Sequence, residues 1–208
     1  MKKLLFAFLS LCTSAKAQDT VTLHHKAYST TFDKIKCYPI KVEWWVTKNS
    51  LLCDNKVKRG DKFIPDPKIA KETDLQKDYT NSGFDRGHNF PAADAACDQV
   101  ANEQSFYFSN MTAQYPALNR GDWKSLEAVV RDMALKNDST KVWCGSFGEV
   151  KKIGKVSIPK QCWKVIYVKG TNEWFAYLFN NDTSKADGLE NNKTSVEEIQ
   201  RLTGFKFK

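Results

Sequence analysis

The stretch GFDRGHNFPAAD at residues 83–94 places His88 between a glycine and an asparagine, two residues after an arginine. A neutral imidazole can take a proton from water near pH 7, so His88 is a candidate general base. An isolated histidine is more often a structural core residue, and its neighbours must decide between the two roles. The chain has three histidines. We expect His24 and His25 to lie in a mobile N-terminal stretch, which leaves His88 alone in the folded body.

This scarcity of histidines excludes several kinds of active site. A zinc site built from several imidazoles cannot be assembled around His88 alone. The sequence contains no G-x-S-x-G motif for a serine hydrolase. None of its cysteines lies in the sequence context of a cysteine protease. The chemistry must therefore come from His88 together with the polar residues that follow it.

Those polar residues recur in two downstream segments. DRGH at 85–88 is followed by SNMTAQ at 109–114 and by LNRGDWKSLE at 118–127. Together they resemble the sugar-nonspecific DNA/RNA endonucleases of the ββα-metal, or His-Me finger, class. VKRGDKF, PKQCWKVIY and SVEEIQRLTGFKF are also similar to that family, so the resemblance covers most of the chain. It implies an α+β domain with a largely antiparallel central sheet, flanked by helices, and a ββα-metal active site.

The resemblance also implies how a phosphodiester would be hydrolysed. His88 would deprotonate the attacking water, and Asn119 would be the single protein ligand of the metal ion. A hard cation that keeps most of its waters needs few protein oxygens, which favours Mg²⁺, with Mn²⁺ as a substitute. Glu127 would accept hydrogen bonds from the waters around that ion. Without the resemblance, Asn119 would be a turn residue and Glu127 would form an ion pair with Arg131.

The remaining site candidates would contact the phosphate or position other groups. Asn110 matches a family site position and would hold His88 or the phosphate, although it could also be a turn residue at a strand end. Arg86, Arg59 and Arg120 present paired donors that suit phosphate oxygens, and Arg131 is a further substrate-binding candidate. The loop around Arg59 could equally be a solvated run of charge. We expect Asp85 to be structural, because an unpaired carboxylate beside a phosphate would repel it.

The pattern of elements along the chain favours an α+β class. Strand-like composition occurs at 37–48, 104–114, 141–147, 162–169 and 173–180. Proline, alanine and capping signals predict helices at 91–103, from an N-cap at Asp122, and from Ser195 to Gly204. Residues 55–68 and 180–192 read as polar loops. We find no repeat or linker, and we predict one domain over residues 18–208.

The N-terminus has the pattern of a signal peptide over residues 1–17. Lys2 and Lys3 precede an apolar run, and an A-x-A site ends at Ala17. We therefore expect an exported protein, periplasmic or secreted, without a membrane span. A lipid anchor at Cys12 is the weaker alternative, because Leu11 stands where a small residue usually precedes the anchored cysteine.

Five cysteines follow this segment, scattered without C-x-x-C spacing. In an exported chain they favour disulfides over metal binding. Cys144 and Cys162 lie in two strand-like segments that could be sheet neighbours, and we predict that they pair. The odd number leaves at least one thiol free or available to a second chain. The oligomeric state stays open.

Together with these features, the resemblance implies an exported, Mg²⁺-dependent endonuclease that cleaves DNA and RNA with little sequence preference and leaves 5′-phosphates. Beyond the signal segment, 29 Lys and Arg face 24 Asp and Glu, which favours a polyanion only mildly. No recognition helix or zinc finger is evident, so base readout is not expected. No protein partner is evident either. One alternative is a catalytically silent nucleic-acid-binding or other polyanion-binding domain, and another is a disulfide-stabilised structural protein.

Overall fold

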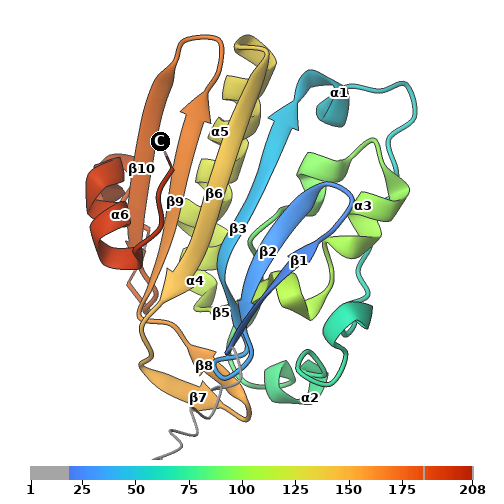
Figure 1. Ribbon diagram of the computed structural model, residues 1–208, viewed down its shortest axis with the longest axis vertical. Helices are drawn as coiled ribbons and strands as arrows, with labels where there is room; N and C mark the ends of the chain where they lie inside the picture. The colour runs from blue at the N-terminus through green and yellow to red at the C-terminus, as the bar shows by residue number, and fades with distance from the viewer. Residues whose placement is uncertain (1–18, 185, 208) are drawn as a thin grey trace, which may run out of the picture.

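A seven-stranded antiparallel sheet forms the centre of the molecule, in the strand order β1-β2-β3-β6-β9-β10-β11 (Figure 1). The computed structural model describes residues 19–184 and 186–207. The strands are β1 (Thr20–His24), β2 (Tyr28–Asp33), β3 (Tyr38–Thr47), β6 (Ser139–Phe147), β9 (Gln161–Val168), β10 (Glu173–Asn180) and β11 (Lys193–Thr194). The largely antiparallel α+β class predicted from the sequence is confirmed.

Helices cover both faces of this sheet because its central strands carry apolar side chains on both faces. On β9, Cys162 and Ile166 join the cluster that contains α5 (Lys124–Lys136). Trp163 and Val165 join the cluster that contains α6 (Val196–Thr203). Successive side chains of a strand point to opposite faces, so α5 and α6 pack on opposite sides of the sheet.

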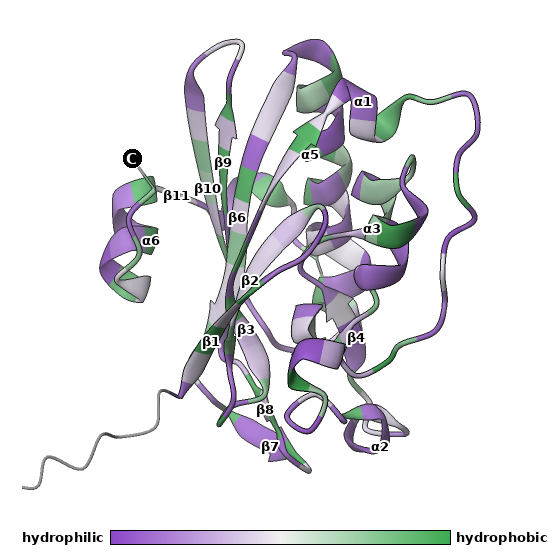
Figure 2. Ribbon diagram, turned by 45° about the vertical axis from the view of Figure 1, so that its right-hand side comes forward, coloured by the Kyte–Doolittle hydropathy of each residue, from purple (hydrophilic) through white to green (hydrophobic). Residues whose placement is uncertain are grey.

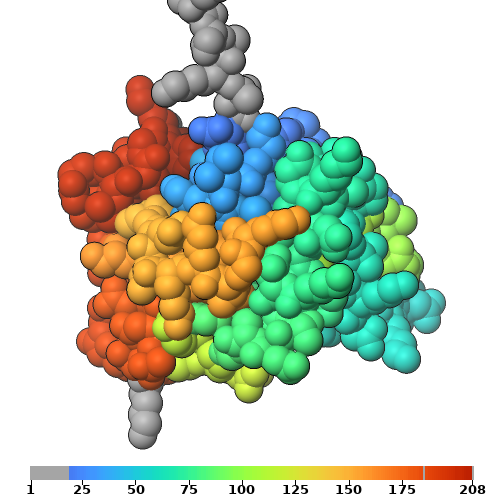
Figure 3. Space-filling model, turned by 90° about the horizontal axis from the view of Figure 1, so that it is seen from below, coloured from blue at the N-terminus to red at the C-terminus, as the bar shows by residue number. Residues whose placement is uncertain are grey.

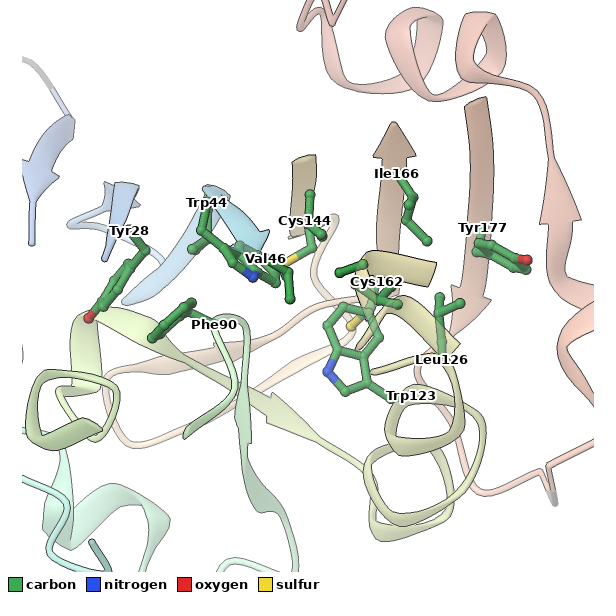
Figure 4. Packing of buried hydrophobic residues seen from close by; sticks show 14 of the residues in the cluster. Tyr28, Trp44, Val46, Phe90, Trp123, Leu126, Cys144, Cys162, Ile166 and Tyr177 are labelled. Atoms are coloured by element: carbon green, nitrogen blue, oxygen red, sulfur yellow. The ribbon is translucent and has the colours of Figure 1, made fainter. Parts of the chain in front are cut away.

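The larger core lies between the sheet and α5. Figure 4 shows Trp123 and Leu126 pointing toward the strands that carry Cys144, Cys162 and Ile166. All five side chains are buried. Burial of large apolar side chains is the main stabilising contribution in a core of this kind. Val130 is buried in the same cluster and Met133 packs against it, so one face of the helix is apolar.

Two small hairpins and several short helices complete the fold. The hairpins are β4 (Asp85–His88) with β5 (Met111–Gln114), and β7 (Lys151–Ile153) with β8 (Val156–Ile158). The short α-helices are α1 (Lys48–Leu51), α2 (Gln76–Tyr79), α3 (Gln99–Gln104) and α4 (Pro116–Leu118). Single 3-10 turns occur at Pro67–Ile69, Ala92–Ala95, Phe108–Asn110 and Leu189–Asn192.

Some predicted boundaries are wrong. The helix expected at 91–103 is two short pieces, because Asp98 caps a new helix by accepting from the Ala101 N–H. Only 111–114 of the strand expected at 104–114 is extended, since the preceding aromatic residues form a buried 3-10 turn. Asp122 is not an N-cap. The helical segment begins earlier, at Pro116, and reaches α5 through a π-helical turn at Asn119–Trp123.

The N-terminal segment is part of the fold, which corrects the expectation of a mobile stretch. His25 lies in the turn between β1 and β2, and its Nε2 is 3.0 Å from Asp66 Oδ2 in a fully buried pair. The predicted signal segment, residues 1–17, lies outside the described residues. No helix within 19–184 and 186–207 is long and apolar enough to cross a membrane.

Two further segments frame one end of the molecule. Residues 52–63 follow α1 as an extended loop along one side (Figure 2). Seen from below, the β7–β8 hairpin, in orange, lies against the green segment that leads into β4 (Figure 3). There the Lys151 ammonium lies 5.1 Å from the centre of the Phe84 ring. The loop and the segment leading into β4 contribute residues to the cavity described next.

Candidate active site

A cavity of about 710 Å³ brings most of the predicted site residues together. It lies where the β4–β5 hairpin meets the start of the long helix. Seven of the eight residues predicted for catalysis, metal binding or substrate contact line it: Arg59, Arg86, His88, Asn119, Arg120, Glu127 and Arg131. His88 and Asn119 are 31 positions apart in the sequence, and the fold places them in one cavity.

The DRGH motif forms strand β4, whose register is fixed against β5. Asp85 is opposite Gln114, and His88 is opposite Met111. Gly87 is required at this crossing, because a Cβ atom there would lie 2.2 Å from Gln114 Oε1. The alternation of the strand puts Arg86 and His88 on one face. The glycine therefore lets the two strands pack closely while its neighbours face the cavity.

The His88 imidazole is held in an aromatic setting with one nitrogen free. Its ring lies edge-on to Phe106, with centroids 4.9 Å apart, and 5.6 Å from Phe63. Nε2 is buried and has no hydrogen-bond partner among the described residues. Burial, and then the Arg59 charge, lower the pKa of His88 to about 3, against a hydrogen bond with the Arg86 backbone that raises it. The ring is therefore neutral at pH 7, and its Nε2 has no partner that would occupy it.

Asp85 joins the strand to the π-helical turn that carries the predicted metal ligand. Asn119 Nδ2 donates to Asp85 Oδ2 at 2.8 Å, and Arg120 donates to both carboxylate oxygens at 2.8 and 2.7 Å. Burial acts to raise the pKa of Asp85, but the hydrogen bonds from Arg120 and Asn119 outweigh it and hold the pKa below its usual value. Asn119 uses its amide nitrogen here, which leaves its carbonyl oxygen for another partner.

Glu127 lies in the first turn of α5 and lines the cavity together with Arg59, Arg131 and His88. Burial raises the pKa of Glu127 to about 7, and Asp94 acts in the same direction. Lys164 opposes this most strongly, followed by Arg131 and Arg59. Near pH 7 the side chain therefore changes charge easily, which suits a group that responds to a nearby cation.

Arg131 forms its ion pair with Asp94, and not with Glu127 as in the alternative considered for the sequence. Arg131 Nη1 lies 3.2 Å from Asp94 Oδ1, and Trp44 Nε1 donates to the other oxygen of Asp94 at 2.9 Å. Burial raises the pKa of Asp94, and the charge of Arg131 is the first influence that opposes it. Arg131 still lines the cavity, and its guanidinium is held by the buried carboxylate of Asp94.

Two other arginines lie on aromatic rings at the cavity wall. The Arg59 guanidinium is 5.0 Å from the centre of the Phe106 ring. Arg86 is 5.1 Å from Phe63 and 5.6 Å from Tyr79. Stacking on a ring fixes the plane of a guanidinium and leaves its N–H edges available for an anion. Arg86 Nε is buried with no partner among the described residues.

Comparison with known proteins identifies the family of this chain. The model of the DNA/RNA non-specific endonuclease family matches residues 12–208. The chain belongs to this family. Its members are hydrolases, and the enzyme class predicted from the sequence is confirmed.

Relatives with nuclease names occur in distant organisms. The chain is 27% identical over 206 residues to a nuclease of Nostoc sp., covering 91% of this chain and 73% of the relative. It is 32% identical over 182 residues to nuclease C1 of Cunninghamella echinulata, covering 78% and 72%. It is 32% identical over 148 residues to human mitochondrial endonuclease G, covering 62% of this chain and half of that protein's length.

A solved structure supports the same assignment of fold. The crystal structure of the EndoG/EndoGI complex aligns with a TM-score of 0.78 at 25% identity. The alignment covers 89% of this chain and 84% of that chain. The sheet, the β4–β5 hairpin and the long helix are thus arranged in the manner of a DNA/RNA non-specific endonuclease.

Within this endonuclease fold, Asn110 lies outside the cavity wall. It is fully buried. Its Oδ1 accepts from the Phe90 N–H, and its Nδ2 donates to the carbonyls of Phe90 and Ser105. Both of its N–H donors are used by the backbone, so none is left for a phosphate. The side chain instead fixes the backbone of Phe90, two residues after His88, and the Ser105 carbonyl.

The predicted disulfide between Cys144 and Cys162 is wrong. The register of β6 and β9 sets Cys144 opposite Lys164 and Cys162 opposite Ser146, so the two cysteines are offset diagonally. Both are free and buried, as is Cys37. The disulfide joins Cys53 to Cys97. It ties the loop of Arg59 to the chain just beyond the cavity wall.

The sequence reasoning also missed contacts made by apolar residues. Phe63 and Phe106 support His88 and two arginines, yet single phenylalanines carry no periodic signal. Trp123 is a further support of the base that the sequence analysis did not identify. Its indole N–H donates to the His88 carbonyl at 2.9 Å. Phe63 did lie within a segment that resembles the family, and that was the signal available for it.

Proposed function

We propose that this protein is an exported, metal-dependent endonuclease that hydrolyses phosphodiester bonds of DNA and RNA with little sequence preference. One observation carries the proposal: a neutral imidazole with a free, buried Nε2 lies in the same cavity as Asn119 and Glu127. A base and a set of hard oxygen donors are what metal-assisted hydrolysis requires.

The donors of the cavity fit a hydrated hard cation. Asn119 would bind the ion through its carbonyl oxygen, and Glu127 would accept hydrogen bonds from the waters of its hydration shell. Within 19–184 and 186–207, no three His, Cys, Asp or Glu side chains are grouped so as to hold a metal ion, so a site of the zinc type has no ligand set there. Mg²⁺, with Mn²⁺ as a substitute, matches these donors. When bound, such an ion supplies positive charge to the phosphoryl and leaving oxygens.

Residues of the chain activate the water and bind the phosphate. His88 takes a proton from the attacking water, and the Trp123 N–H on its carbonyl keeps the base in place. Arg59 and Arg86 neutralise the phosphoryl oxygens from the aromatic wall. Arg131 is oriented by Asp94 toward the same anion. Arg120 is bound to Asp85 but its side chain is 71% exposed, so it meets the substrate at the rim.

The charge of the cavity supports a polyanionic substrate better than the whole-chain charge does. Arg59, Arg86, Arg120, Arg131 and Lys124 line it, against the two carboxylates of Asp85 and Glu127. These cations contact phosphates, which carry no sequence information. The expected substrates are therefore DNA and RNA alike, cut without marked base preference.

Export is supported by the chemistry of the cysteines. A disulfide between Cys53 and Cys97 is stable in an oxidising compartment and rare in a reducing one. The basic and apolar pattern of residues 1–17 supplies the corresponding signal. Periplasmic and secreted destinations are both consistent with this proposal.

The proposal is tested with purified protein, supercoiled plasmid and a structured RNA. We expect cleavage of both in Mg²⁺ or Mn²⁺ and none in excess chelator, with scattered cut positions and 5′-phosphate ends. Salt-sensitive binding of DNA without cleavage would replace this function with the silent binding domain. Absence of both binding and cleavage would leave a structural role.

A further inference from the structure

A buried lysine lies beneath the cavity and has no part in the mechanism described so far. Lys164 is on β9 and is 1% exposed. Its neighbours across the sheet are Cys144 on β6 and Tyr177 on β10, both buried. A lysine is almost never fully buried unless it is paired, because removing its charge from water is costly.

The partner of Lys164 is an aromatic face instead of a close carboxylate. Its ammonium lies 4.1 Å from the centre of the Trp123 ring. Among the residues that the structure describes, no carboxylate oxygen lies within 4.0 Å of it. A desolvated ammonium on a tryptophan face is stabilised, but this contact alone does not neutralise the charge. The compensation must come from carboxylates further away.

Those carboxylates belong to Glu127 and Asp94. Lys164 is the strongest of the charges that lower the pKa of Glu127, and it also lowers that of Asp94. Arg131, Arg59 and the Cys144 thiol also interact with the charge of Glu127. The other charged or titratable groups of the same cavity are His88, Asp85, Arg86, Arg120 and Lys124. Asp94 and Arg131 already form a close pair, which leaves Lys164 as the natural counter-cation of Glu127.

The same lysine also contacts the residue that secures the base. Trp123 receives Lys164 on its ring face and donates its N–H to the His88 carbonyl. Glu127 follows Trp123 by four residues, on the same side of the helix. Lys164 therefore contacts the tryptophan that reaches the base, and that tryptophan lies about one helical turn before Glu127.

We propose that Lys164 is a positioning residue for phosphodiester hydrolysis: its buried ammonium, held on the Trp123 ring, stabilises the charged form of the Glu127 carboxylate at the cavity. The inference rests on the proposed function for its link to catalysis. The charge relationship itself belongs to the metal-free protein and can be measured there.

Substitution of Lys164 by Met removes the charge and keeps most of the side-chain volume. In metal-free protein labelled with ¹³C at the glutamate carboxyls, we expect the Glu127 resonance, assigned with Glu127→Gln, to titrate near pH 7 in the wild type. In Lys164→Met its midpoint should rise by at least about one pH unit, a tenfold change in proton affinity. Ile166→Ala is the matched control, since Ile166 is equally buried on the same strand face. It should leave the midpoint unchanged.

Cleavage at saturating Mg²⁺ gives the second measurement. Lys164→Met should shift the acid side of the pH profile upward and recover toward the wild-type rate at higher pH. Any loss of cleavage rate in Ile166→Ala should be the same at every pH. An unchanged Glu127 midpoint, or a uniform loss of rate in Lys164→Met, would overturn the inference.

Should Lys164→Met fail to fold, Lys164→Gln takes its place, and a double-mutant cycle with Glu127→Gln provides an independent test. Removing both charges should be less destabilising in urea than the sum of the single changes, whereas additive effects would contradict the pairing. The titration and the cycle need neither metal nor substrate. An absence of cleavage by the wild type would therefore refute the proposed function while leaving these two results decisive for Lys164.

Discussion

Trp123 donates its indole N–H to the backbone carbonyl of His88 at 2.9 Å, which ties the start of the long helix to the DRGH strand. The two residues are 35 positions apart in the sequence. The contact explains how a base on a short two-stranded hairpin keeps a fixed position relative to Asn119 and Glu127. Catalytic geometry is sensitive to small displacements of this kind.

Trp123→Phe removes this hydrogen bond and keeps a large ring. The part-buried His88 carbonyl then loses this donor, which costs about 1–3 kcal/mol. We expect a lower urea midpoint and a larger loss of cleavage rate than stability alone explains. Leu126→Ala, which disturbs the same helix without touching His88, should be destabilised without that extra loss of rate. Equal losses in the two variants would argue against a positioning role.

Gly87→Ala tests the close crossing of β4 and β5. The new methyl group would overlap the Gln114 side chain, and relieving that overlap costs about 1–3 kcal/mol. The strand that carries Arg86 and His88 would move, so we expect both stability and cleavage to fall. Gln114→Ala in the same chain should restore much of both. Thermal unfolding and plasmid nicking of the three variants measure this, and a harmless Gly87→Ala would be the contrary result.

The stability of the fold should depend on pH through Asp66. Burial acts to raise the pKa of Asp66, but hydrogen bonds from His25, Ser109 and the Lys68 backbone outweigh it and lower the pKa. A lowered folded pKa contributes stability that is fully present above the unfolded value, about 3.9, and is lost as the pH falls through the folded value. The advantage of the wild type over Asp66→Asn in urea should therefore be large at pH 7 and shrink below pH 4. A difference that is constant with pH would exclude this contribution.

The disulfide should stabilise the protein and support Arg59. It closes a loop with a sequence separation of 44 residues, and a chain-entropy estimate gives about 4 kcal/mol for such a loop. The Cys53→Ser, Cys97→Ser double variant should unfold at lower urea and bind DNA more weakly, because the Arg59 loop loses its tether. Reductant should affect the wild type and leave the double variant unchanged. Identical responses would show that the bond does not form.

The sequence predicts well those helices and strands that are determined by residues close together in the chain. The strands from 139 onward alternate or run apolar, and the last helix has its cap at Ser195 and its left-handed end at Gly204. The parts it missed depend on tertiary contacts. His25 is ordered by Asp66, which is 41 positions away, and the disulfide joins two cysteines outside the strands that are 44 positions apart.

The site shows the same division. Motif residues such as His88, Asn119 and Glu127 could be found because their types and spacing resemble the family. Their supports could not, since Phe106, Trp123 and Lys164 look like ordinary core or surface residues in the sequence. Lys164 in particular is the one charged residue of a mostly apolar strand, and only its burial shows that it needs a compensating charge.

The cleavage rate of His88→Ala is the most direct test of the account. With Mg²⁺ at saturation and folding verified by circular dichroism and urea unfolding, loss of the general base should slow plasmid cleavage by about 10²–10⁴-fold. Asn110→Ala is a less suitable comparison because its side chain holds the backbone, so the exposed Lys136→Ala serves as the control and should keep the wild-type rate. A folded His88→Ala protein that cleaves as fast as the wild type would contradict the central claim.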